Sequence, residues 1–201
     1  MIRILLAEDQ TMFRRAVAEV LSREPDLEIV GEVERGDSVV ELAVQTRPNV
    51  VLIDIEMPYM DGMTVAGQLR RELPGCRTLI LTVFGRPGYV RRAIDLGVGG
   101  FILKESTPYD LVAAIRRVAM GDFVFDPELL LSTLKHGTSP LTPREREVLS
   151  LSWRGASAEE VAQHLHLSAA TVRNYLSKVI QKLGARNKIE AARIAEETGW
   201  L

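Results

Sequence analysis

The chain has 201 residues, of which 46% are hydrophobic and 26% charged, with a formal net charge of −2. These values are ordinary for a soluble globular protein of one large or two small domains. No apolar run reaches the roughly 20 residues of a membrane-spanning helix, and acids at positions 8 and 9 come too early for a signal peptide. The single cysteine excludes an internal disulfide framework, so we expect a cytoplasmic protein with no membrane insertion.

The first 121 residues alternate apolar strands with amphipathic helices. Val50-Val51-Leu52-Ile53 is an unbroken apolar run, typical of a strand buried on both faces of a parallel sheet. We predict five strands, at residues 2–7, 27–30, 50–53, 78–82 and 100–104, each followed by a helix. Thr107 and Pro108 form the start of the last helix. The pattern predicts an α/β domain with a five-stranded, parallel, doubly wound (flavodoxin-like) sheet of order 2-1-3-4-5.

Polar side chains stand where these strands end. In the order 2-1-3-4-5, strands one and three are neighbours, so their carboxyl ends should crowd three carboxylates into one cleft. Like charges at such distances need a neutralising cation, and oxygen ligands suit Mg²⁺. A lysine and a threonine hydroxyl at the other two strand ends complete a set suited to phosphoryl transfer onto a carboxylate. The residues are Glu8, Asp9, Asp54, Thr82 and Lys104.

With these residues, the segment 1–121 resembles a response-regulator receiver domain. The resemblance implies that Asp54 is the phosphoacceptor, that Asp9 binds Mg²⁺ directly and that Glu8 does so largely through water. It also makes Asp54 and the backbone carbonyl of Glu56 metal ligands. The sequence departs from the family pattern at Val83, where a small residue is usual, and an acid at position 56 could redirect the attacking water, so the rates of phosphorylation and dephosphorylation are open.

The same resemblance implies a switch. Lys104 would pair with the phosphoryl group, Thr82 would move toward it, and Phe101 would turn inward with that movement. The predicted site residues also have ordinary interpretations. An acid at a strand end can be a solvated loop residue, and an aromatic residue in a strand is usually part of the core. Five matches at five successive positions favour the functional interpretation.

A linker of residues 122–140 follows. Residues 123–127 read as a short apolar turn, residues 128–135 as a short helix, and His136-Gly137-Thr138-Ser139-Pro140 as a hinge rich in turn residues.

Residues 141–201 predict a four-helix domain. Thr142-Pro143-Arg144-Glu145 and Ser157-Ala158-Glu159-Glu160 are both capping patterns. A tight turn then leads to Ser168, which caps a longer helix from 169 to about 183, so the pair forms a helix-turn-helix. Residues 173–193 carry many basic side chains and one acid, which indicates a polyanion partner. The basic residues are Arg173, Lys178, Lys182, Arg186, Lys188 and Arg193, and the acid is Glu190.

The stretches 141–149 and 170–175 resemble the opening motif and the recognition-helix start of LuxR/FixJ-type (NarL family) DNA-binding domains. The resemblance implies that Arg173 and Asn174 read base edges, while Lys178 and Lys182 contact phosphate. Ser177 stands where that family often has a basic residue, and its contact with DNA is left open. The ordinary alternative for these charges is a solvated helix face.

Within this family, residues 84–89, 187–191 and 199–200 resemble DesR-type regulators of membrane lipid fluidity. The resemblance implies a non-enzymatic two-component response regulator and transcription factor, phosphorylated by a sensor histidine kinase, which dimerises and binds promoter DNA of lipid desaturation genes. RNA polymerase is a further candidate partner. One alternative is a doubly wound aspartyl phosphatase that pairs Asp54 with Glu56, but in that class the nucleophile ends the first strand. The other is a DNA-binding protein independent of phosphorylation.

Overall fold

The computed structural model describes residues 1–83, 85, 87–135 and 139–201. They form two compact units, residues 1–83, 85 and 92–129, and residues 87–91, 130–135 and 139–201. The first three positions of the predicted hinge, 136–138, and two positions of the DesR-like motif, 84 and 86, lie outside the described residues. Within the described part of the chain, none of the helices has the length and apolarity to cross a membrane.

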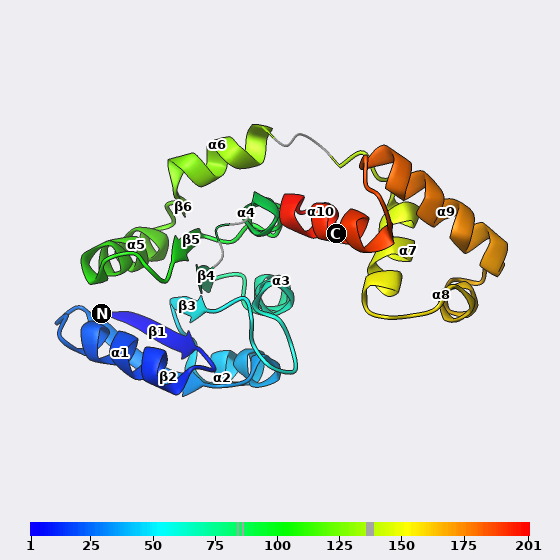
Figure 1. Ribbon diagram of the computed structural model, residues 1–201. Helices are drawn as coiled ribbons and strands as arrows, with labels where there is room; N and C mark the ends of the chain where they lie inside the picture. The colour runs from blue at the N-terminus through cyan, green and yellow to red at the C-terminus, as the bar shows by residue number, and fades with distance from the viewer. Residues whose placement is uncertain (84, 86, 136–138) are drawn as a thin grey trace. The chain divides into compact units, whose positions relative to one another are not determined.

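The first unit is built on a parallel sheet with the order β2-β1-β3-β4-β5-β6 (Figure 1). The predicted fold class and order are confirmed for the first five strands. Their bounds are β1 Ile2–Ala7, β2 Leu27–Val33, β3 Val50–Ile53, β4 Arg77–Thr82 and β5 Gly100–Leu103.

A sixth strand corrects the prediction of five. β6 (Val124–Phe125) pairs in parallel with β5, with Phe101 opposite Phe125. The sequence predicts an apolar turn in this segment. Two residues are too few to show the alternation that identifies a strand in sequence, and β6 exists because the edge of β5 offers it backbone partners: the Val124 amide donates to the carbonyl of Gly99 at 2.9 Å.

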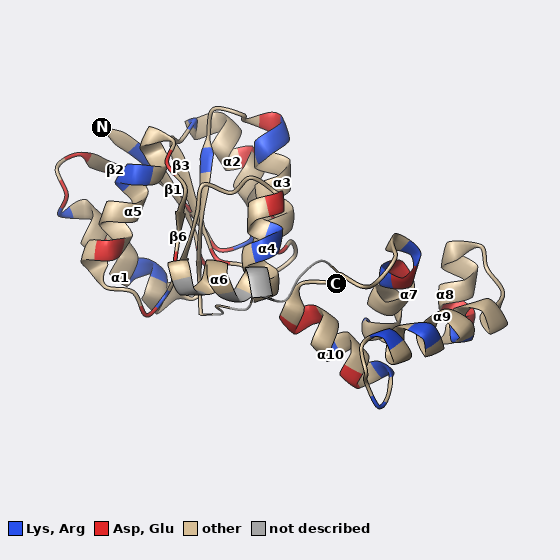
Figure 2. Cartoon of the chain, turned by 90° about the horizontal axis from the view of Figure 1, so that it is seen from above, with Lys and Arg blue, Asp and Glu red and all other residues tan. Residues whose placement is uncertain are grey.

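Helices cover both faces of the sheet (Figure 2). α1 (Thr11–Ser22) and α5 (Pro108–Met120) lie on one face, whereas α2 (Val39–Thr46), after a short 3-10 turn, and α3 (Gly62–Glu72) lie on the other. α4 (Pro87–Asp95) is the helix that follows β4. The Thr107 hydroxyl caps α5 by accepting from the Asp110 amide at 3.2 Å, as predicted. All four residues of β3 are fully buried, as expected of a central strand covered on both faces.

The second unit contains the four predicted helices, α7 (Pro143–Trp153), α8 (Ala158–Leu165), α9 (Ala169–Lys182) and α10 (Lys188–Thr198), after the linker helix α6 (Pro127–Lys135). Both predicted capping boxes are present, at the starts of α7 and α8. Two small apolar clusters hold this unit together, one centred on Val148, Val161 and Val172, and the other on Leu149, Val179 and the alanines of α10.

Candidate functional sites

The pairing of β1 with β3 brings two acids together. Ala7 lies opposite Ile53 in the parallel register, so the next residue of each strand, Glu8 and Asp54, leaves the sheet at the same edge. The Asp54 amide continues this pairing by donating to the Ala7 carbonyl at 3.1 Å. Glu8 is 1% exposed and Asp54 4% exposed, so both carboxylates are held in the protein and not in solvent.

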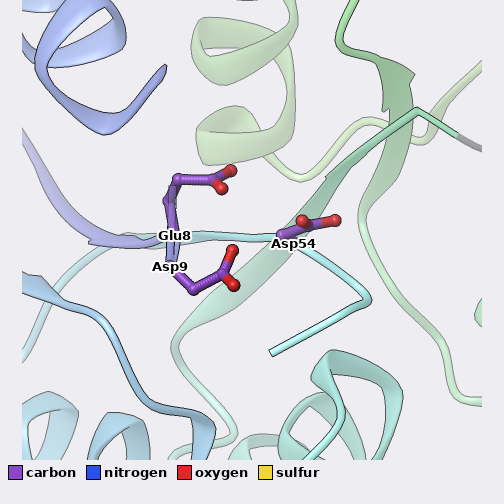
Figure 3. Close-up of side chains that lie close together, drawn as sticks. All are labelled: Glu8, Asp9 and Asp54. Atoms are coloured by element: carbon purple, nitrogen blue, oxygen red, sulfur yellow. The ribbon is translucent and has the colours of Figure 1, made fainter. Parts of the chain in front are cut away.

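Asp9 completes a cluster of three carboxylates (Figure 3). Ligand oxygens of Glu8, Asp9 and Asp54 all lie within 4.8 Å of one another, with Asp9 at the exposed side. Carboxylate oxygens at this spacing are the donor set that a hard divalent cation such as Mg²⁺ prefers. The residues present therefore fit the metal that the sequence predicted.

Lys104 closes the other side of the cluster. Its ammonium lies 2.7 Å from Glu8 Oε2 and 2.9 Å from Asp54 Oδ2, and its side chain is only 6% exposed. The Lys104 amide donates to the Thr82 carbonyl at 2.8 Å, which ties it to the end of β4. The ring of Phe13 lies over the ammonium, 4.7 Å from nitrogen to ring centroid. One buried positive charge thus faces three carboxylates, and the cluster keeps a negative excess that attracts a cation.

The pKa values of two groups reflect this burial. Burial raises the pKa of Glu8, and the hydrogen bonds from Lys104 and the Gln10 amide offset this only in part. Burial alone would lower the pKa of Lys104, but its hydrogen bonds to Glu8 and Asp54 outweigh that effect and raise the pKa above its usual value. Lys104 therefore stays protonated at neutral pH, in the form that pairs with an anion.

The remaining residues predicted for the receiver occupy three different environments. Thr82 is fully buried at the end of β4, and Phe101 is 2% exposed within β5. Glu56 is exposed in the loop that follows Asp54. The structure thus places Thr82 and Lys104 at adjacent strand ends beside the carboxylates, because Thr82 lies opposite Leu103 in the sheet.

Two glycines that the sequence did not mark allow the loops to close around Asp54. A Cβ added to Gly62 would lie 2.0 Å from the Asp54 carbonyl oxygen, and one added to Gly36 would lie 1.8 Å from that of Met60. The Gly62 amide donates to the Ile55 carbonyl at 2.9 Å. Only glycine permits these close backbone approaches. Both glycines are visible in the loop sequence, but no local pattern indicates which backbone carbonyl each of them approaches.

A third unpredicted feature lies in the same loop. Tyr59 has a φ of 67°, in the left-handed region that residues with side chains rarely adopt, and the residue is 76% exposed. The Arg35 guanidinium lies over that ring, 3.8 Å from the centroid. The contact joins the loop after β2 to the loop after β3.

The second unit presents a helix-turn-helix. His166 directly follows α8 and has a left-handed φ of 54°, and the Leu167 amide donates back to the Ala162 carbonyl at 2.8 Å. Ser168 then caps α9, accepting from the Thr171 amide at 3.0 Å. Val172 and Val179 are fully buried, which fixes the face that α9 turns inward. The predicted turn and cap are confirmed.

The opposite face of α9 is exposed and basic. Figure 2 shows Lys and Arg along this helix. All five residues predicted to contact DNA are exposed: Arg173, Asn174, Ser177 and Lys178 on this face, and Lys182 at the end of the helix.

Two of these five residues form ion pairs within the unit. Arg173 pairs with Glu159 of α8, and both side chains are well exposed. The Lys182 ammonium lies 2.7 Å from the carboxylate of Glu145, which is only 4% exposed in its side chain. Sequence reasoning recognised Glu145 as a helix cap but missed this pair, since 37 residues separate its members.

A parallel sheet with carboxylates and a lysine at its strand ends, followed by a helix-turn-helix with a basic face, defines a DNA-binding signalling protein. Two family models match the chain, "Response regulator receiver domain" over residues 4–116 and "Bacterial regulatory proteins, luxR family" over residues 139–195. The chain belongs to the two-component response regulators that carry a LuxR-type DNA-binding domain, and it is a transcription factor of that family.

Relatives of full length support this assignment. The chain is 42% identical to the uncharacterised transcriptional regulatory protein YvfU of Bacillus subtilis, covering all of both chains. It is also 42% identical to the transcriptional regulatory protein DesR of the same organism, covering all of this chain and 99% of that one. Among solved structures, RcsB of Salmonella enterica serovar Typhimurium, bound to a promoter with a beryllofluoride phosphomimetic, superimposes with a TM-score of 0.69 at 26% identity, covering 100% of both chains.

Proposed function

We propose that Asp54 is the phosphoacceptor of this response regulator. The observation that carries the proposal is the buried cluster of Glu8, Asp9 and Asp54, with the Lys104 ammonium 2.9 Å from Asp54. We further propose that residues 1–121 are the receiver domain, 122–140 the linker and 141–201 the DNA-binding domain.

Mg²⁺ is the proposed cofactor. The carboxylates of Glu8, Asp9 and Asp54 would hold it, with the backbone carbonyl of Glu56 as a further ligand. Bound there, the cation neutralises negative charge on the phosphoryl oxygens during transfer.

The chain's own residues then have distinct tasks. An oxygen of Asp54 attacks the phosphorus of a phosphohistidine on a sensor kinase. The P–N bond breaks as the O–P bond forms, and the imidazole leaves with its electron pair and takes a proton. The Lys104 ammonium compensates the charge that Asp54 gains. Transfer of this kind needs little beyond positioning and charge neutralisation.

Phosphorylation would act as a switch between two pre-existing states. Lys104 and the Thr82 hydroxyl would bind the phosphoryl oxygens, and a change at Phe101 would carry the difference to the receiver surface. A phosphoryl group can shift the equilibrium only by binding one state better than the other. Homodimerisation is the proposed output, since it brings two helix-turn-helix units to two half-sites about one helical turn apart.

Phosphoryl uptake is the first test. The full chain is incubated with Mg²⁺ and acetyl phosphate or phosphoramidate, and incorporation is measured by intact mass and by borohydride mapping. We expect one phosphoryl group in the wild type and in Asp95→Asn, an exposed acid of α4, but none in Asp54→Asn. A wild type that takes up no phosphoryl group from either donor, or uptake that survives in Asp54→Asn, would overturn the proposal and favour a regulator that works without phosphorylation.

Dimerisation is tested by sedimentation in Mg²⁺ with and without beryllofluoride. We expect a shift from monomer to dimer in the wild type and no shift in Asp54→Ala. If beryllofluoride binds and the mass is unchanged, dimerisation is rejected as the output, and release of the DNA-binding domain within one chain is favoured instead.

The proposed DNA contacts predict two different defects. The variants are compared on a duplex selected for tight binding to the wild type and on a duplex of random sequence. Lys178→Ala, which removes a phosphate contact, should weaken binding to both duplexes alike and reduce the salt dependence of the binding constant by about one ion. Arg173→Ala or Asn174→Ala should reduce the preference for the selected duplex over the random one. Ser177 and Lys182 are proposed as additional contacts. Fluorescence anisotropy over a range of salt concentrations separates the two classes, and equal losses for all variants would contradict the assignment.

The likeness to DesR-type regulators adds a finer proposal, control of lipid desaturation genes. The chain is equally identical to YvfU, so overall identity does not favour one target over another. Sequencing of genomic fragments that the beryllofluoride-bound protein retains would decide it, and an absence of desaturase promoters among them would reject this target. RNA polymerase remains a candidate partner at such promoters.

A further inference from the structure

Arg14 is an unusual residue for the inner face of α1. Its side chain is 8% exposed, although arginine is almost never this buried unless it is paired. Its neighbour Arg15 is exposed on the same helix. A buried guanidinium needs partners for its five N–H donors, and these partners show what Arg14 does.

One guanidinium nitrogen of Arg14 donates to the backbone carbonyl of Glu8 at 2.6 Å. That carbonyl belongs to the peptide that joins Glu8 to Asp9, the two adjacent acids of the carboxylate cluster. A peptide is planar, so a hydrogen bond that fixes its oxygen also fixes the direction in which the chain leaves toward Asp9. Glu8 is held independently by its ion pair with Lys104 and by the pairing of β1 with β3. Asp9, in contrast, is exposed and depends on its backbone for orientation.

The Arg14 guanidinium also forms ion pairs with two carboxylates. Its remaining nitrogens pair with Glu34 and, at 3.3 Å, with Glu32, both at the end of β2. With two carboxylates against one guanidinium, the group of Arg14, Glu32 and Glu34 adds no net positive charge beside the metal cluster. The contribution of Arg14 to the site is therefore geometric.

We propose that Arg14 is the positioning residue of the magnesium site, anchoring the Glu8–Asp9 peptide to β2 so that Asp9 faces Glu8 and Asp54. The inference rests on the proposed function, since it takes Mg²⁺ as the ligand of this cluster. Residues that orient metal ligands from outside typically contribute 10- to 100-fold to metal affinity. We expect loss of the Arg14 contact to weaken Mg²⁺ binding by about tenfold or more.

The experiment compares four variants of the full chain with the wild type. Arg14→Ala removes the anchor, and Arg15→Ala is the matched control on the exposed face of α1. Arg14→Lys keeps the charge, but its single ammonium cannot span both the carbonyl and the carboxylates as a planar guanidinium does. Glu34→Gln weakens the ion pair while leaving the bond to the Glu8 carbonyl in place. Folding is checked by thermal unfolding in EDTA, and Mg²⁺ affinity is measured by calorimetry.

The Asp9 amide supplies a readout that a merely structural role would not move. Its ¹⁵N shift reports on the hydrogen bond accepted by the Glu8 carbonyl in the same peptide, and it can be followed in EDTA without metal. We expect this shift to change in Arg14→Ala and Arg14→Lys, together with the loss of Mg²⁺ affinity. Arg15→Ala and Glu34→Gln should keep both the shift and an affinity within about twofold of the wild type.

The outcomes separate this inference from the function on which it rests. If the wild type itself binds no Mg²⁺, the proposed metal site fails. If the wild type binds but a folded Arg14→Lys binds as well as it does, positioning by the guanidinium is refuted. Should Arg14→Ala not fold, Arg14→Lys carries the test alone. A loss in Glu34→Gln equal to that in the arginine variants would overturn the assignment to the carbonyl contact.

Discussion

Replacing Lys182 with methionine tests how the recognition-helix unit is held together. Its ammonium lies 2.7 Å from Glu145 Oε2 and donates to the Pro140 carbonyl at 3.2 Å. The same carboxylate oxygen accepts from the Thr142 amide at 2.7 Å and from its hydroxyl at 3.0 Å. Lys182 thus joins the end of α9 to the start of α7. Methionine keeps the length and apolar stem of lysine but removes the charge.

The size of the expected loss in stability follows from the burial of Lys182 and Glu145. Removing one partner of a fully buried ion pair costs about 3–5 kcal/mol, whereas an exposed pair contributes about 0–1 kcal/mol. Here the Glu145 side chain is 4% exposed but that of Lys182 is 37% exposed, and Glu145 keeps its two bonds from Thr142. We therefore expect Lys182→Met to lower the free energy of unfolding by about 2 kcal/mol, or about 10 °C in Tm for a unit of this size.

Tryptophan fluorescence of the full chain is the assay. The two tryptophans, Trp153 and Trp200, both lie in the second unit, so their emission reports its unfolding selectively. The matched control is Lys178→Met, one turn earlier on the exposed face of α9. Surface substitutions of this kind are usually within about 0.5 kcal/mol of the wild type.

The pH dependence gives a second readout. Burial raises the pKa of Glu145, but the hydrogen bonds from Lys182 and Thr142 outweigh it, so the pKa lies below its usual value. A carboxyl with a lowered folded pKa stabilises the fold above its unfolded pKa of about 4.3, and that contribution disappears as pH falls through the folded value. The difference between Lys182→Met and the wild type should therefore shrink below about pH 4. A destabilisation no larger than that of Lys178→Met at pH 7, or one that does not shrink in acid, would refute this reasoning.

Three further predictions concern the receiver, each measured by urea unfolding of the full chain followed by far-UV circular dichroism. Gly62→Ala should destabilise by about 2 kcal/mol or more, because its Cβ would meet the Asp54 carbonyl at 2.0 Å, whereas Gly75→Ala, with nothing within 4 Å, should be nearly neutral; equal effects would contradict this. Tyr59→Gly should be neutral or stabilise by up to about 1 kcal/mol, since it relieves a left-handed φ of 67°, and a clear loss would show that the exposed ring matters more than the backbone. Leu52→Ala should cost about 2–5 kcal/mol, because its fully buried side chain leaves a cavity, and a loss below 1 kcal/mol would mean that the core collapses to fill it.

Much of the receiver site follows from order along the chain. Glu8 and Asp54 each come directly after an apolar strand, and parallel pairing of β1 with β3 then forces them to one edge. The same argument places Thr82 beside Lys104. The predicted roles of these side chains in phosphorylation, and those of the five α9 residues in DNA binding, stay predictions that the experiments above address.

The sequence by itself determined the first five strands, the helices and their caps, because apolar periodicity and capping act within a few residues of one another. The order of those five strands followed from the usual connections of a doubly wound sheet. Tertiary structure alone decided the pairing of β6 with β5, the bond from Arg14 to the Glu8 carbonyl and the ion pair of Lys182 with Glu145. Each of these joins groups whose meeting depends on how whole elements pack. A buried charge or an edge backbone takes whichever partner that packing brings within reach, and no local pattern records which partner it will be.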